Sequence, residues 1–188
     1  REILEQIENV QVLSLFSNKV MDFLDCLSRR LMDSNKAKKY SDVIAYAFWI
    51  RRASLEKASI PYKGKEQKIG RGVAFQIAPA NIPVQFAVSM TYALIAGNVS
   101  LVRISDKKFE QTDIICETIQ DILYDTYPDM AAYICIFQYS HDDNITQALS
   151  DICDIRMIWG GNHTISTIRK TMVRPRQTII VVCFFKRC

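Results

Sequence analysis

One amide side chain stands between two prolines in the segment Ala78-Pro79-Ala80-Asn81-Ile82-Pro83. The rings of Pro79 and Pro83 restrict the backbone on both sides, so Asn81 could hold its NH2 group rigidly toward a ligand. A preorganised amide donor of this kind stabilises an oxyanion that develops in a transition state. The same residue could instead cap a helix that starts near Pro83, and spacing alone favours this plainer interpretation.

Two further segments carry groups that could contact a nucleotide. Arg103 and Ser105 place a cation and a hydroxyl just after a predicted strand, where they could hold a ribose or a phosphate. Gly160 and Gly161 precede Asn162, and glycines there would let the backbone and a helix N-terminus approach an anion. Each segment also has an ordinary interpretation, the first as a helix cap with solvated charges and the second as a tight turn.

The cysteines and histidines form no recognisable metal or redox motif. None of the six cysteines has a partner at C-x-x-C spacing, and His141 and His163 are far apart, so we expect no metal site. Cys26, Cys116 and Cys135 fall on apolar faces, where free cysteines behave as small buried hydrophobic residues. With no signal peptide at its start, the sequence favours a reducing, cytoplasmic setting.

Composition narrows the class of protein. The chain has 188 residues, of which 49% are hydrophobic and 23% charged, and these values are typical of a globular domain. The net charge of +4 is scattered and no basic stretch is interleaved with aromatic residues, so we expect no nucleic-acid binding. No residue from 73 to 102 is charged, but prolines and Gly97-Asn98 interrupt the run. Burial of strands and a helix is therefore expected rather than a membrane span.

The order of the expected elements indicates a parallel α/β fold. The first 70 residues predict helices, one with an apolar face over 20–31 and a second with Ser41 as its N-cap. Strands are then expected over residues 73–78, 99–104, 131–137, 155–159 and 178–185. Helices are expected over residues 84–96, 109–127 (capped by Ser105 or Asp106), 145–150 and 164–170. This alternation predicts a Rossmann-like parallel sheet flanked by helices, with ligands beyond the carboxyl ends of its strands.

Four short motifs occur in the order in which the aldehyde dehydrogenase superfamily carries them. They are Pro79-Ala80-Asn81-Ile82-Pro83, Ala96-Gly97-Asn98, Arg103-Ile104-Ser105 and Trp159-Gly160-Gly161-Asn162. Their variants resemble the acyl-CoA reductase family, which includes the fatty-acid reductase of bacterial bioluminescence, over about residues 70–170. The resemblance implies an aldehyde-dehydrogenase-like dinucleotide-binding domain over residues 70–188, preceded by an N-terminal helical region over 1–69.

The resemblance also implies a role for each motif. Asn81 would donate to the oxyanion of a thioester-derived tetrahedral intermediate, and Arg103 and Ser105 would hold the adenosine ribose or its phosphate. The remaining residues implied in cofactor binding are Pro79, Ala80, Gly160, Gly161 and Asn162. Members of the family form an acyl-cysteine from an acyl-CoA or acyl-carrier thioester and reduce it to an aldehyde with NADPH. Homo-oligomers or partner subunits are also implied.

The chain departs from the family pattern where the nucleophile should be. The family's nucleophilic cysteine lies in a second domain, whereas Cys183 falls inside an expected strand and Cys188 is the last residue. We assign neither as nucleophile and expect an incomplete protein: the cofactor-binding part of an NADPH-dependent acyl-CoA reductase, inactive without its catalytic domain. The alternative is a non-catalytic remnant that binds a nucleotide or a partner protein on the same fold.

Overall fold

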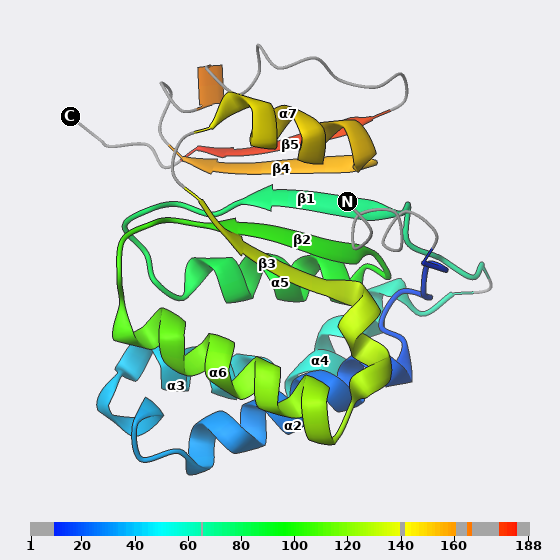
Figure 1. Ribbon diagram of the computed structural model, residues 1–188. Helices are drawn as coiled ribbons and strands as arrows, with labels where there is room; N and C mark the ends of the chain where they lie inside the picture. Colours follow the sequence, from blue (N-terminus) through cyan, green and yellow to red (C-terminus); the bar gives the residue numbers. More distant parts are fainter. Residues whose placement is uncertain (1–9, 65, 140–141, 161–164, 167–176, 184–188) are drawn as a thin grey trace.

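The fold is built on a parallel β-sheet, which Figure 1 shows in a computed structural model of the chain. The structure describes residues 10–64, 66–139, 142–160, 165–166 and 177–183. Within these ranges the sheet has five strands: β1 (Val73–Ile77), β2 (Val99–Ile104), β3 (Ile134–Gln138), β4 (Ile155–Gly160) and β5 (Thr178–Cys183). Their order is β3-β2-β1-β4-β5 and all neighbours pair in parallel, which confirms the predicted α/β class.

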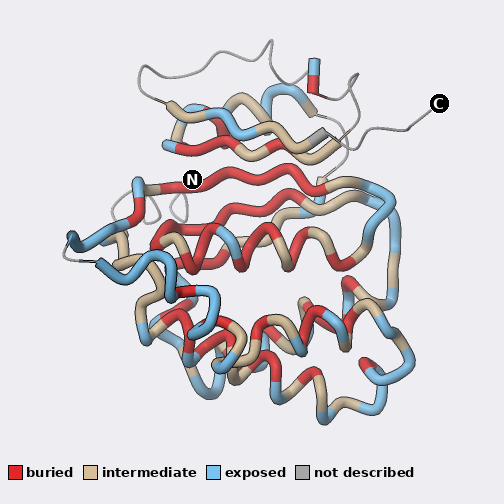
Figure 2. Tube along the Cα trace, turned by 180° about the vertical axis from the view of Figure 1, so that it is seen from behind, coloured by how far each residue is buried: buried red, intermediate tan, exposed pale blue. Residues whose placement is uncertain are grey.

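Helices connect the strands and cover the sheet. Helices α5 (Gln85–Ile95) and α6 (Glu110–Asp125) link β1 to β2 and β2 to β3, and α7 (Asp143–Ile152) links β3 to β4. The chain reverses its direction across the sheet after β3, so right-handed crossovers place α7 on the face opposite α5 and α6. Strand β1 is buried along its whole length, and the central strands form the red runs of Figure 2.

The N-terminal residues form a second helical layer beneath α5 and α6 (Figure 1). It contains α2 (Asn18–Asp33), α3 (Ser41–Trp49) and α4 (Arg52–Ser59), with short 3-10 turns η1 (Ala37–Lys39) and η2 (Ile60–Tyr62). The apolar face of α2 predicted from spacing is fully buried: Val20, Phe23, Leu24, Leu27 and Leu31. These residues share one hydrophobic core with the sheet, while the division at residue 69 stays a prediction.

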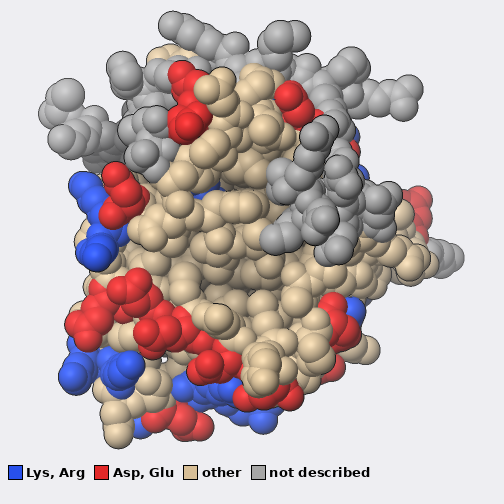
Figure 3. Space-filling model, viewed as in Figure 1, with Lys and Arg blue, Asp and Glu red and all other residues tan. Residues whose placement is uncertain are grey.

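Ion pairs tie the helical layer to α6 at the surface. Arg30 lies 2.9 Å from Asp125 and Lys36 lies 3.4 Å from Glu117, and Figure 3 shows acidic and basic side chains alternating over these helices. The Arg30 guanidinium holds the pKa of the Asp125 carboxyl below its usual range. Exposed pairs of this kind stabilise a fold little, so the buried apolar contacts hold the layers together.

The uncharged segment 73–102 forms β1, α5 and most of β2 at the centre of the molecule. Phe75, Met90 and Leu101 within it are fully buried, which confirms the predicted burial. No helix in the described ranges combines the length and the apolar character needed to cross a bilayer.

Two predicted helix caps were wrong. The helix α3 begins at Ser41 as predicted, but Tyr40 rather than Ser41 is its N-cap, without a side-chain cap bond. Helix α6 begins after Phe109, because the Ser105 hydroxyl instead accepts from the backbone N–H of Lys107 (3.1 Å) and closes a local turn. Serine hydroxyls satisfy turns as readily as helix ends, so residue type alone did not locate either cap.

Two element starts also differ from the prediction. Helix α5 begins at Gln85 with Val84 as N-cap, so Pro83 lies in the preceding turn rather than at the helix start. Residues 131–133 belong to the 3-10 segment η3 (Pro128–Tyr133), and β3 begins only at Ile134. Pro128 opens that segment, where its missing N–H leaves no donor unpaired.

A tight backbone junction joins the N-terminal chain to the amino ends of β1 and β2. Gly97 has φ +83° and accepts from the N–H of Leu13 (2.9 Å), while the N–H of Gly70 donates to the Leu13 carbonyl (2.9 Å). A Cβ on Gly97 would lie 2.1 Å from the Leu13 oxygen, and one on Gly70 would lie 2.1 Å from the Gly97 oxygen. Only glycine fits at either position.

Two polar side chains complete this junction. Asn98 Oδ1 accepts from the backbone N–H groups of Arg71 (2.7 Å) and Gly72 (3.2 Å), which aligns the chain entering β1 with the chain entering β2. Asp154 Oδ2 accepts from the N–H of Val73 (2.8 Å), which aligns β1 with β4 in the same way. The junction therefore sets the register of the three central strands.

We expect Gly97→Ala to lower the free energy of unfolding by about 2–4 kcal/mol, since it combines a left-handed backbone with a steric clash. Urea unfolding followed by circular dichroism measures the change. Gly64→Ala is the matched control, because nothing lies within 4 Å of its added Cβ, and it should change stability by less than about 0.5 kcal/mol. Equal stability of the two variants would show that the junction is not tight.

Candidate functional site

Three of the predicted segments meet at the carboxyl edge of the sheet. β1 lies between β2 and β4, so the connections leave in opposite directions at this switch point, where parallel sheets generally bind their ligands. Ile77 pairs in register with Arg103 of β2 and with Ile158 of β4. The turn that carries Asn81 follows β1 directly, and Gly160 ends β4, so the described parts of the three segments lie at the same edge of the sheet.

Asn81 lies on the exposed turn between β1 and α5. Ala80 and Asn81 are exposed, whereas Pro79 and Pro83 are half-buried, and the Pro83 carbonyl accepts from Thr112 Oγ1 of α6 (3.1 Å). Because Val84 is the N-cap of α5, Asn81 is not used as a cap. No described group hydrogen-bonds the Asn81 side chain, so its amide is open to a ligand on an anchored turn.

A shallow apolar depression lies beside this turn. Its wall is made of residues from β1–α5 and β2–α6, namely Pro79, Ile82, Pro83, Phe86, Ile104 and Phe109, with Ser105 and Lys107 among its polar residues. Its volume is about 20 Å³, which is room for little more than one water molecule. The depression can therefore support one side of a bound group but cannot enclose it.

Arg103 is buried at the end of β2 with 9% of its surface exposed. Its Nη2 donates to the backbone carbonyl of Tyr139 (3.1 Å), and its Cζ lies 5.2 Å from the centre of the Tyr139 ring. Tyr139 was not among the residues predicted from the sequence. The signal that could have pointed to it was an aromatic residue two positions after the predicted strand 131–137.

Ser105 is half-buried and directly follows β2 at the same edge. Its hydroxyl lies 3.3 Å from Asp106 Oδ1, and its carbonyl accepts from Gln138 Nε2 (3.2 Å) at the end of β3. Ser105 and Arg103 therefore lie at the edge as predicted. The Asp106 carboxylate adds a negative charge that the prediction of a phosphate site did not include.

The glycine segment after β4 is described only in part. Gly160 is half-buried and pairs in register with Cys183, the last described residue of β5. Gly161 and Asn162 lie outside the described residues, as do His163 and Cys188. Their predicted contacts with the dinucleotide stay predictions.

Three of the described free cysteines lie where a thiolate is disfavoured. Burial, together with the carboxylates of Asp113 and Glu117, raises the pKa of the Cys116 thiol to about 12. Burial also raises the pKa of the Cys135 and Cys153 thiols. Because the thiolate is the attacking form, these three thiols are unsuited to forming an acyl-cysteine at neutral pH.

The described residues also contain no cluster of three or more metal-ligating side chains.

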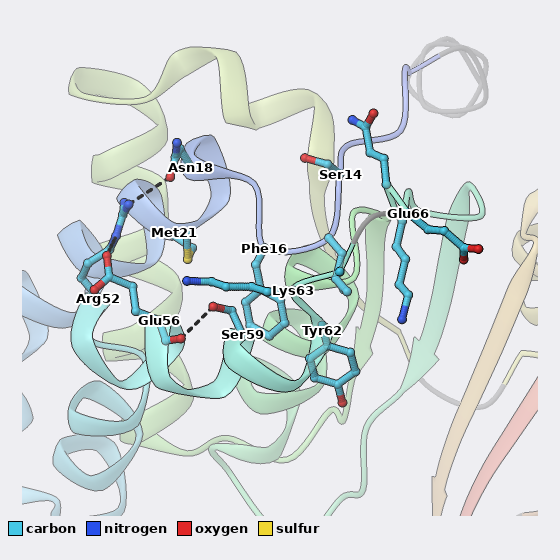
Figure 4. Close-up of a pocket in the computed structure, with 14 residues that line it drawn as sticks. Ser14, Phe16, Asn18, Met21, Arg52, Glu56, Ser59, Tyr62, Lys63 and Glu66 are labelled. Carbon is cyan, nitrogen blue, oxygen red and sulfur yellow. Dashed lines mark hydrogen bonds and ion pairs between the residues drawn. The ribbon is translucent and has the colours of Figure 1, made fainter.

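A larger pocket of about 450 Å³ lies away from this edge, among α2, α4 and the chain before β1 (Figure 4). Phe16, Met21 and Tyr62 contribute apolar surface to it. Arg52 at its rim is already bound to the side chains of Asp22, Glu56 and Asn18. None of the four motifs lines this pocket, so it is separate from the candidate cofactor site.

Comparison with known proteins identifies the family. A model of the acyl-CoA reductase (LuxC) family matches residues 3–182. The chain belongs to the acyl-CoA reductase family. The match confirms the resemblance seen in the motifs and extends it over the N-terminal helices. No curated protein in the comparison matches the chain significantly.

Solved structures of several other proteins share the fold of this chain at low sequence identity. Proline utilization A from Bradyrhizobium japonicum superposes with a TM-score of 0.66 at 14% identity, over 97% of this chain and 23% of that chain. PnpE in complex with nicotinamide adenine dinucleotide superposes with a TM-score of 0.65 at 17% identity, over 90% of this chain and 40% of that chain. An NAD-dependent benzaldehyde dehydrogenase from Corynebacterium glutamicum superposes with a TM-score of 0.60 at 12% identity, over 87% of this chain and 41% of that chain. The fold is thus that of aldehyde dehydrogenases, and this chain spans less than half of each protein.

We expect iodoacetamide to label Cys116 slowly at pH 8, because a pKa of about 12 leaves roughly one thiol in 10,000 ionised. The rate should rise about tenfold for each pH unit, as the thiolate fraction does. Peptide mass spectrometry measures it, and the urea-unfolded chain, in which all thiols are accessible, is the control. Rapid labelling of Cys116 in the folded chain at pH 8 would contradict the prediction.

Proposed function

We propose that this chain forms the cofactor-binding part of an NADPH-dependent acyl-CoA reductase, which reduces an acyl thioester to an aldehyde through an acyl-cysteine. The family match over residues 3–182 carries the proposal. The meeting of the Asn81, Arg103 and Gly160 segments at one edge supports it. The four described cysteines outside β5 are free thiols, which supports a reducing, cytoplasmic setting.

The residues at the edge fit part of a dinucleotide. The Tyr139 carbonyl occupies one of the five guanidinium N–H donors of Arg103, and no described acceptor takes the others. Those donors can bind a ribose hydroxyl or a 2′-phosphate, and the Ser105 hydroxyl can bind a sugar beside them. The carboxylate of Asp106 opposes a phosphate at Ser105, so we place a 2′-phosphate on the Arg103 side.

Asn81 acts on the acyl carbonyl in this proposal. When a cysteine thiolate attacks the thioester, the carbonyl oxygen gains negative charge, and the NH2 group of Asn81 donates to it. The original C–S bond then breaks, which releases the CoA or carrier thiolate and leaves the acyl-cysteine. The bond from Thr112 to the Pro83 carbonyl anchors the turn, so little reorganisation accompanies the reaction. NADPH, when bound, supplies the hydride that converts the acyl-cysteine to aldehyde and thiolate. We assign no nucleophile among the described residues, and the chain alone is inactive in this proposal.

A second candidate is a non-catalytic protein that binds a nucleotide or a partner on the same fold. The raised pKa values of Cys116, Cys135 and Cys153 favour it, because they leave these thiols without an activated form. Aldehyde formation from acyl-CoA and NADPH by the native gene product decides between the two. Nucleotide binding without any aldehyde would support the second candidate.

Arg103→Ala is expected to weaken NADPH binding about tenfold or more, because the cation that faces the nucleotide is lost. Quenching or enhancement of NADPH fluorescence gives the dissociation constant, and circular dichroism checks the fold. Arg103→Lys keeps the charge without the planar fork, so it should recover only part of the affinity. A folded wild-type chain that does not bind NADPH or NADH would overturn the proposed function.

Asn81→Ala is expected to lower kcat for aldehyde formation by the native gene product about 100-fold, as loss of one oxyanion donor does. The dissociation constant for NADPH should stay within about twofold. Asn35→Ala, at another exposed asparagine, is the matched control and should leave both values unchanged. An unaltered kcat in Asn81→Ala would remove Asn81 from the mechanism.

A further inference from the structure

Arg103 is held in place by the connection between β3 and α7 rather than extending freely from β2. Its Nη2 donates to the Tyr139 carbonyl (3.1 Å), and the Tyr139 ring centre lies 5.2 Å from its Cζ. The Tyr139 hydroxyl lies 3.2 Å from Thr146 Oγ1. The Thr146 hydroxyl in turn donates to the Asp142 carbonyl (2.8 Å). The proton of Thr146 is thus committed, so Tyr139 is the donor to Thr146.

The strand register explains why this pair forms. Arg103 pairs with Phe137 of β3, and Tyr139 follows two residues later. Side chains two residues apart in extended chain point to the same face, so the Tyr139 ring comes to lie against the guanidinium. Burial raises the pKa of Tyr139, which keeps its hydroxyl protonated and able to donate to Thr146.

We propose that Tyr139 is a positioning residue that aims Arg103 at the nucleotide and thereby sets the preference for NADPH over NADH. This inference rests on the proposed function. The Tyr139 ring centre lies 5.2 Å from the guanidinium carbon and the Tyr139 carbonyl takes one donor, which leaves the other in-plane donors of the guanidinium for a ligand. That arrangement suits two hydrogen bonds from Arg103 to one phosphate. A freely rotating arginine would lose side-chain freedom when it formed these bonds, and this loss would weaken binding.

The test compares Tyr139→Leu with Tyr139→Phe in the native gene product. The probes are NADPH and NADH, together with adenosine 2′,5′-bisphosphate and 5′-AMP, titrated by calorimetry. Loss of the ring in Tyr139→Leu should weaken binding of NADPH and of the bisphosphate about three- to fivefold. NADH and 5′-AMP should be unaffected. Tyr139→Phe keeps the ring and should bind all four within about twofold of wild type.

A double-mutant cycle shows whether Tyr139 acts through Arg103. In an Arg103→Leu background, Tyr139→Leu should cause no further loss of NADPH affinity. Tyr139→Met, which keeps the bulk without the ring, replaces Tyr139→Leu if circular dichroism shows that the latter does not fold.

Two results would overturn the inference while leaving the proposed function intact. One is an equal loss of NADPH and NADH affinity in Tyr139→Leu, which is what a merely structural residue would give. The other is unchanged NADPH affinity in that variant while Arg103→Leu still weakens it. Failure of the wild-type protein to bind either dinucleotide would instead remove the proposed function, and the inference with it.

Discussion

The close approach of three backbone segments at the amino ends of the strands determines where the candidate site forms. Gly70, Gly97 and Leu13 meet through backbone hydrogen bonds, and the glycines leave no room for a side chain. This contact and the Asn98 bonds start β1 and β2 in register, with Val73 opposite Val99. Parallel strands that start together also end together, so Ile77 finishes beside Arg103 at the opposite edge.

The motifs that identify the family thus divide into two kinds. Ala96-Gly97-Asn98 is structural, since Gly97 ends α5 with a left-handed backbone and Asn98 accepts two backbone N–H groups. The segments around Asn81 and Arg103 carry groups that can contact a ligand at the carboxyl edge. A fold retained at 12–17% identity in aldehyde dehydrogenase-like structures fits this division, because few positions are required for register.

The candidate site combines groups held to different degrees. Arg103 is buried and held by Tyr139, whereas Asn81 is exposed on the turn that Thr112 anchors at the Pro83 carbonyl. A buried cation needs partners to offset the loss of hydration, and the carbonyl and ring of Tyr139 supply them. The exposed amide of Asn81 is solvated by water and needs no such partner. Its hydrogen bond to a ligand becomes strong only when the ligand excludes water from the edge of the sheet.

The sequence by itself determined which segments form strands or helices and the order of the motifs, though not where β3, α5 and α6 begin, because segment type depends on periodicity and backbone preference over short stretches. It also indicated the family, through motifs that are themselves local. Only the tertiary structure showed that Ser41 and Ser105 are not caps and that Asn81 is free of any cap bond. The same holds for the pairing of Arg103 with Tyr139, 36 positions apart, because strand register decides it and register arises only when distant segments pack together.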